Sequence, residues 1–158
     1  MSGIFRLAFN TFGVAMNKAP IALPIYEAIV DVEDAVELGH GPLGVRRMIN
    51  ILGGEFQGPR LRGRVLPGGA DRQLIRPDGV RLLDALYEMQ TDDGVVLTVH
   101  NRVKVIERPG MERQAFSHLD ITAPEGAYGW LNDTVLIGTA VPMRPARQAV
   151  QICVFQLS

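Results

Sequence analysis

A group of polar and aromatic side chains capable of chemistry falls on segments that alternate like β-strands. Its members are Asp71, Asp84, Tyr87, His100, Asn101, Arg102, His118, Trp130 and Asn132. A cavity that combines a carboxylate, a phenol or imidazole and an aromatic wall suits proton transfer, in which one group removes a proton and another stabilises the oxyanion. The group therefore indicates isomerase, cyclase or lyase chemistry that needs no cofactor.

Residue type suggests a role for four of these side chains. His100 or Asp84 would act as the base, while Tyr87 or Arg102 would hold an oxyanion or a substrate carboxylate. The candidates for ligand binding are Asp71, Asn101, His118, Trp130 and Asn132. In a purely structural alternative, Asp71 and Asp84 accept backbone N–H groups and set the strand register, with Arg102 and Asn132 as their partners. We expect His100→Ala to leave folding intact and to change ligand binding.

Other kinds of site have little support. The histidines His40, His100 and His118 lack metal-ligand spacing, so a metal site is not expected. The chain has no Gly-x-Ser-x-Gly motif, no phosphate-binding loop and no dinucleotide fingerprint. Cys153 cannot form an internal disulfide, and its apolar neighbours predict a buried position.

Length and charge narrow the class of protein. A chain of 158 residues fits one domain, which we place at residues 25–158 after an N-terminal arm, residues 1–24. The net charge of −1 predicts no nucleic-acid or membrane partner. Polar residues interrupt every apolar run of the arm before it could span a bilayer, and we expect a cytoplasmic protein. A signal peptide ending near Ala19 or Ala22 is the alternative.

About nine segments read as strands, and none is a convincing helix. They are Ile25–Glu33, Val45–Ile51, Leu61–Val65, Arg72–Arg76, Val80–Thr91, Val95–Glu107, Ala115–Thr122, Tyr128–Val141 and Gln148–Leu157. Turn signals separate them at short, regular intervals, which is typical of an antiparallel sandwich or barrel. We favour an all-β antiparallel barrel, because closure removes the exposed edges of a sheet.

Polarity differs between the two faces of several strands. Arg47 alternates in step with Val45, Ile49 and Ile51. In the predicted strand Val95–Glu107, Asn101 shares a face with apolar residues, whereas His100 shares the other face with Arg102 and Lys104. Which face points inward decides which of these residues can meet a ligand.

The stretch from Gly53 to Gly79 is too rich in glycine and proline for a helix. We predict two successive hairpins here, with turns at Pro67-Gly68-Gly69 and at Pro77-Asp78-Gly79. Gly63 inside a strand indicates a bulge, a bend or a close backbone approach.

The same stretch carries a family resemblance that extends from about Ile25 to the C-terminus. The matching segments are Gly53-Gly54, Gly58–Gly63, Val65–Asp71, Arg76–Gly79, Leu83–Ala85 with Tyr87, Thr91–Gly94, Asn101-Arg102, and Trp130–Asn132 with Gly138-Thr139. In these segments the chain closely resembles the bacterial and fungal family called domain of unknown function 3237. The resemblance implies a small antiparallel barrel, similar in style to calycin and allene oxide cyclase barrels and often dimeric, without a settled activity.

The chain departs from that family at residues that could line a cavity. Arg72 stands where relatives have an aromatic residue, Thr98 where they have tyrosine, and Val103 where they often have glycine. We therefore add Arg72 to the ligand-binding candidates. A cation at a cavity wall would favour an anionic ligand.

These observations lead to one preferred hypothesis and two alternatives. We expect a cofactor-independent barrel enzyme that acts on a small, partly apolar organic molecule. A ligand carrier or sensor would use the same cavity without catalysis, and a structural, oligomer-forming protein would have a filled interior. Ionisable side chains facing one pocket favour the enzyme, and an apolar lumen favours the carrier.

Overall fold

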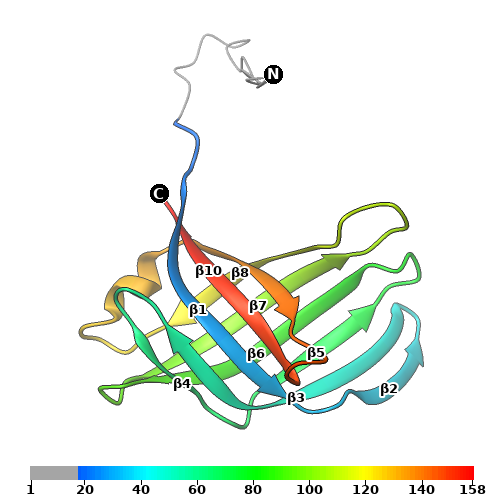
Figure 1. Cartoon of the computed structure of the whole chain (residues 1–158), viewed down its shortest axis with the longest axis horizontal. Helices are drawn as coiled ribbons and strands as arrows, with labels where there is room; N and C mark the ends of the chain where they lie inside the picture. The colour runs from blue at the N-terminus through cyan, green and yellow to red at the C-terminus, as the bar shows by residue number, and fades with distance from the viewer. Residues whose placement is uncertain (1–17) are drawn as a thin grey trace.

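The computed structural model describes residues 18–158, which form one antiparallel sheet closed into a barrel (Figure 1). Its strands are β1 (Ala22–Val32), β2 (Val36–Gly41), β3 (Gly44–Gln57), β4 (Arg62–Val65), β5 (Ala70–Ile75), β6 (Arg81–Thr91), β7 (Val96–Ile106), β8 (Gln114–Thr122), β9 (Leu136–Pro142) and β10 (Ala149–Leu157). A short 3₁₀ helix, η2 (Gly129–Asp133), lies between β8 and β9. The all-β barrel expected from the sequence is confirmed.

Closure of the barrel depends on β1, because this strand pairs on both of its edges. One edge of β1 pairs with β10, from Ala22 opposite Leu157 to Asp31 opposite Ala149. Its other edge pairs with the second half of β3, from Glu27 opposite Gln57 to Val32 opposite Ile51. The remaining neighbours follow as hairpins through β9, β8, β7 and β6. The sheet edges are therefore joined at β1.

Two positions around the barrel are each shared by two successive strands. The first half of β3 pairs with β2 and its second half with β1. On the other edge of β3, β5 pairs with the first half and β4 with the second, and both also pair with β6. The ten strands therefore occupy eight positions around the barrel.

The prediction of two successive hairpins is therefore half wrong. β4 and β5 do not pair with each other but follow one another along the gap between β3 and β6. Pro67 to Gly69 lie in the loop that joins β4 to β5, and Gly68 has a φ of 107°. Proline and glycine are equally suited to a hairpin turn and to a loop that joins two consecutive strands in the same position of the sheet. The second predicted hairpin, β5 to β6, is confirmed.

Smaller differences concern elements with weak sequence signals. The region of β2 is not among the predicted strands, because Gly39 and Gly41 interrupt its alternation. The predicted strand Tyr128–Val141 contains η2 in its first half and β9 in its second. β1 begins at Ala22, three residues before the predicted start, and residues 1–17 of the predicted arm lie outside the described residues.

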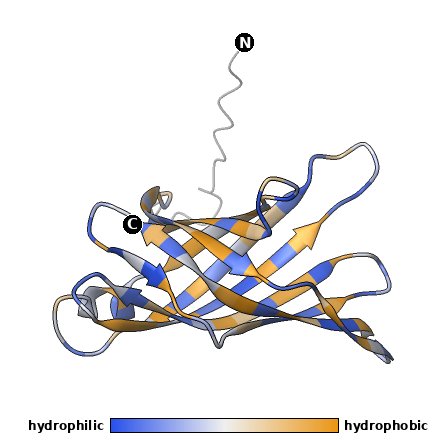
Figure 2. Ribbon diagram, turned by 60° about the horizontal axis from the view of Figure 1, so that its bottom comes forward, coloured by the Kyte–Doolittle hydropathy of each residue, from blue (hydrophilic) through white to orange (hydrophobic). Residues whose placement is uncertain are grey.

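Buried and exposed residues alternate along most strands, and Figure 2 shows hydrophobic and hydrophilic residues alternating along the ribbons. In β8, Ala115, Ser117, Leu119 and Ile121 are buried while the residues between them are exposed. Ile152 and Val154 of β10 are also buried, which places Cys153 on the outer face. The prediction of a core position for Cys153 was wrong, because strand alternation outweighs the apolar character of its neighbours. No helix among the described residues is long and apolar enough to cross a membrane.

Gly63 of β4 sits where no side chain fits. A Cβ atom at this position would overlap the backbone carbonyl oxygen of Gln90 on the neighbouring strand β6. The close backbone approach expected at Gly63 is confirmed.

Replacing Gly63 by Ala should lower the free energy of unfolding by about 1–3 kcal/mol, because the added methyl group pushes β4 away from β6. Gly41→Ala is the matched control, since a Cβ there meets nothing within 4 Å and its φ is not positive. Urea unfolding of both variants measures the difference. Equal stabilities would contradict this account of Gly63.

Candidate ligand-binding site

One end of the barrel is closed by η2 and the loop between β3 and β4. Leu131 of η2 and Leu61 of the loop are buried, and the Arg60 guanidinium lies 3.8 Å from the ring centroid of Trp130. The Asn132 side chain accepts a hydrogen bond from the Ala123 N–H (2.8 Å) and donates one to the Ala123 carbonyl (3.0 Å). Trp130 and Asn132, both predicted to bind ligand, therefore belong to this closure.

The other half of the barrel holds a cavity of about 360 Å³. Aliphatic side chains from all around the barrel form most of its wall, namely Val30, Val32, Ile49, Ile51, Leu83, Val103, Val105, Val150 and Ile152. The turn after β1 and the segment after β9 line its mouth. A cavity of this size and character suits a small, largely apolar organic molecule.

Three polar side chains interrupt this apolar wall around Ala85. In the register of the sheet, Ala85 lies directly between Asp71 of β5 and Asn101 of β7. Tyr87 follows two positions along β6 and so points to the same face. Asp71, Tyr87 and Asn101 all line the cavity. The small side chain of Ala85 leaves space between them, and we call these three residues the polar triad.

Two members of the polar triad have buried oxygen atoms that find no hydrogen-bond partner within residues 18–158. These are the Tyr87 hydroxyl and the Asn101 side-chain oxygen, in residues that are each only 2% exposed. Leaving a buried polar group unsatisfied costs about 1–3 kcal/mol. Such groups beside a cavity are suited to hydrogen bonds with a ligand.

Asp71 is held firmly by its neighbours. Its Oδ2 accepts a hydrogen bond from Gln73 Nε2 (2.6 Å) and its Oδ1 accepts one from the backbone N–H of Asp84 (3.0 Å). Burial raises the pKa of Asp71, and this effect exceeds the lowering caused by these two hydrogen bonds. Asp71 thus also has the backbone contact expected of a register residue.

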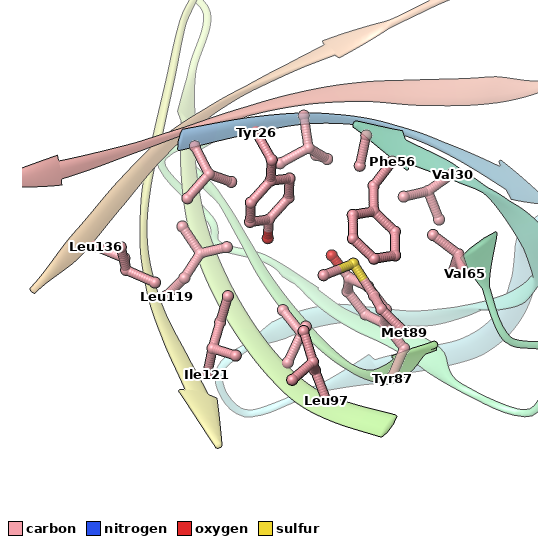
Figure 3. Close-up of a cluster of buried hydrophobic side chains, with 14 of the residues drawn as sticks. Tyr26, Val30, Phe56, Val65, Tyr87, Met89, Leu97, Leu119, Ile121 and Leu136 are labelled. Atoms are coloured by element: carbon pink, nitrogen blue, oxygen red, sulfur yellow. The ribbon is translucent and has the colours of Figure 1, made fainter. Parts of the chain in front are cut away.

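The Tyr87 phenol lies near a second buried phenol. Figure 3 shows Tyr26 and Tyr87 reaching into the same interior from different strands, beside Phe56 and Met89. The Tyr26 hydroxyl also lacks a hydrogen-bond partner in the part of the chain that the structure describes. Burial raises the pKa of both phenols well above that of free tyrosine, so both stay protonated and can donate a hydrogen bond.

Another group of predicted site residues lies on the outer face of the barrel. His100 Nε2 is 2.6 Å from Asp84 Oδ1, and Arg102 Nη2 is 2.8 Å from Asp120 Oδ2. His118 lies opposite Arg102 and is exposed. Arg72, opposite Asp84, is exposed as well.

None of the residues His100, Asp84, Arg102, His118 and Arg72 lines the cavity. The hypothesis that His100 or Asp84 acts as base beside Tyr87 is therefore corrected, because strand alternation directs these side chains away from the lumen. The argument for an anionic ligand from Arg72 fails for the same reason. Any other role of this outer group stays a prediction.

Of the polar cavity-lining residues that sequence reasoning missed, Arg47 and Gln73 are connected to Asp71 of the polar triad. Both line the cavity, and Arg47 Nε donates a 2.6 Å hydrogen bond to Gln73 Oε1. The alternation of Arg47 with Val45, Ile49 and Ile51 was a usable signal for an inward position. Gln73 had no such signal, since β5 is short. Among the described residues, no group of three or more His, Cys, Asp or Glu side chains could hold a metal ion.

Fold and cavity together define a small antiparallel β-barrel with a cavity at its open end. The chain belongs to the protein family of unknown function DUF3237, which it matches over residues 20–157. It is 52% identical over 73 residues to a UPF0311 protein of Rhodopseudomonas palustris, covering 46% of each chain. It is 41% identical over 78 residues to one of Bradyrhizobium diazoefficiens, covering 49% of this chain and 51% of the relative. These alignments span about half the length of the curated relatives.

Solved structures share the fold over nearly the whole chain. A conserved protein of unknown function from Rhodopseudomonas palustris has 30% identity and a TM-score of 0.81, covering 90% of this chain and 100% of the other. A β-barrel-like protein from Acinetobacter baumannii has 26% identity and a TM-score of 0.82, covering 92% and 100%. An enzyme from Penicillium herquei has 21% identity and a TM-score of 0.74, covering 92% and 99%, which shows a shared fold alone.

Asp71→Asn should change how stability depends on pH. Because the pKa of Asp71 is raised in the folded state, the native chain binds this proton more tightly folded than unfolded. Its stability should therefore fall as pH rises above the ordinary aspartate value of about 3.9 and through the folded-state pKa. The variant lacks this term, so its stability relative to the native protein should increase with pH.

Urea unfolding at several values between about pH 4 and pH 8 measures the effect. Asp120→Asn, which removes one exposed carboxylate from the outer face, controls for net charge. A stability difference between Asp71→Asn and the native protein that does not vary with pH would contradict the assignment.

Proposed function

We propose that the cavity binds a small, partly apolar organic molecule and catalyses proton transfer on it without a cofactor, as in an isomerase, cyclase or lyase. The observation that carries this proposal is the polar triad in an otherwise aliphatic wall, with unsatisfied buried oxygens on Tyr87 and Asn101. If the interior served stability alone, apolar side chains throughout would stabilise the fold better, because they leave no buried polar group without a hydrogen-bond partner.

Asp71 is the base in this proposal. A raised pKa makes its ionised form a stronger base than an ordinary aspartate carboxylate. The hydrogen bonds from Gln73 and from the Asp84 N–H fix the carboxylate in position. The carboxylate would remove a proton from a carbon next to a carbonyl group. After this proton exchanges with solvent at the open end of the cavity, Asp71 could return a proton to the same carbon or to another atom of the substrate.

Tyr87 is the electrophilic partner. Its raised pKa keeps the phenol protonated, so its O–H can donate a hydrogen bond to the oxygen that becomes negative when the carbon loses its proton. The Asn101 side chain, on the opposite flank of Ala85, would orient the same substrate. Aliphatic neighbours exclude water, which strengthens both interactions.

A ligand carrier or sensor is the second candidate, and the dominance of aliphatic side chains in the wall favours it. The cavity disfavours the third hypothesis, a structural protein with a filled interior. The enzyme from Penicillium herquei has a similar fold, which supports the view that such a barrel can host catalysis.

Exchange of substrate protons with solvent separates the enzyme from the carrier. We expect the native protein to incorporate deuterium from D₂O into at least one member of a panel of aromatic and keto acids, measured by NMR. Asp71→Asn should reduce the rate by about 100-fold or more, and Tyr87→Phe by about 10- to 100-fold. Asp84→Asn on the outer face should change it far less, because the Asp84 charge makes only a minor contribution to the raised pKa of Asp71.

Two results would count against the enzyme. Binding of panel members to the cavity without any exchange would favour the carrier. Exchange that survives Asp71→Asn but disappears in Asp84→Asn would move the reaction to the outer face.

A further inference from the structure

The charges at the cavity mouth are mostly paired with one another. Four arginines line the cavity. Arg81 and Arg113 both contact Glu107, at 2.7 and 3.2 Å, and Arg144 contacts Asp34 at 3.1 Å. Glu33 accepts a hydrogen bond from Asn50 at 2.9 Å. Most charged side chains at the mouth therefore already have a partner within the protein.

Arg47 differs from these arginines because it has no ion pair among residues 18–158. Its only side-chain hydrogen bond within that range is the one from Nε to Gln73. Residues 1–17 contain no Asp or Glu, so the remaining sequence offers no acidic side chain either. Neither terminal nitrogen of the guanidinium therefore has a hydrogen-bond partner among residues 18–158.

The position of Arg47 is nevertheless fixed. Gln73 is 5% exposed, accepts from Arg47 and donates to Asp71, so the three side chains form one connected row. A guanidinium held through Nε presents its two terminal N–H groups in a geometry that matches a carboxylate.

Arg47 also lies at a useful distance from the polar triad. Ile49, Asp71 and Ala85 lie side by side on neighbouring strands. Arg47, which pairs with Gln73, lies two residues along β3 from Ile49, on the side of the open end. Two residues along a strand correspond to about 7 Å. A small molecule can span this distance with an anionic group at one end and a reacting carbon near Asp71.

We infer that Arg47 is the anion anchor of the cavity and that the ligand is a small organic carboxylate with an apolar body. This inference rests on the proposed function, whose site it extends. The carboxylate contacts the terminal nitrogens of Arg47, the apolar body lies against the aliphatic wall, and the polar triad contacts the far end.

The test compares acids with their neutral amides. A panel of arylalkanoic and aryl keto acids, each with its primary amide, is titrated into the native protein, Arg47→Gln, Arg47→Lys and Arg144→Gln, with binding followed by NMR. The native protein should bind at least one acid about tenfold or more tightly than its amide. Arg47→Gln should lose this preference while the amide affinity changes less than about twofold, and Arg144→Gln should keep it.

Arg47→Lys keeps the charge but lacks the paired N–H groups, so a partial preference is expected. The Arg47 Nε–H resonance, followed in the native protein, should shift with acids and not with amides. This signal serves even if Arg47→Gln fails to fold. The inference is overturned if no acid binds better than its amide, if the preference survives Arg47→Gln, or if the resonance does not respond to a bound acid.

Failure of this inference can be distinguished from failure of the proposed function. Asp71→Asn should keep the acid preference while it loses proton exchange. Exchange without any acid preference would overturn the anchor alone. Acid preference without exchange would overturn catalysis and leave the anchor standing.

Discussion

The pairing of β1 with both β10 and β3 is the interaction on which the rest of the structure depends. Without the contact between β1 and β3, the sheet would be open and its inner face would meet water. Arg147, in the segment between β9 and β10, reinforces this seam with hydrogen bonds to Asp31 of β1 (2.7 and 2.8 Å) and Glu55 of β3 (3.0 and 3.2 Å). This seam between β1 and β3 encloses the interior, where burial raises the pKa of Asp71 and Tyr87.

That interior is divided between stability and binding. At the end closed by η2, large buried side chains such as Phe56, Met89 and Leu97 fill the lumen. At the open end the wall is lined by smaller residues around Ala85, and a cavity remains. Two of the four buried side-chain atoms that have no hydrogen-bond partner among residues 18–158, those of Tyr87 and Asn101, belong to this cavity wall. A cavity and unsatisfied polar groups both lower stability, so a purely structural barrel would avoid combining them, whereas a binding site requires both.

Strand alternation and turn chemistry made the barrel predictable, and the hairpin from β6 to β7 follows directly from its Asp-Gly turn. The sequence did not reveal that β4 and β5 share one position between β3 and β6, because local turn residues do not specify which strands pair with each other. For the site, the useful signal was a polar residue in step with apolar ones, as at Asn101 and Arg47. His100 was a candidate because an imidazole can act as a base, but Arg102 and Lys104 on the same face of the strand indicate that this face is exposed to solvent.

The most direct test of the account is a crystal structure of the protein with a bound acid from the binding panel. We expect electron density inside the barrel, with the carboxylate at the terminal nitrogens of Arg47 and the other end of the molecule beside Asp71 and Tyr87. Density on the outer face near His100 and Asp84, with the cavity unchanged, would contradict it.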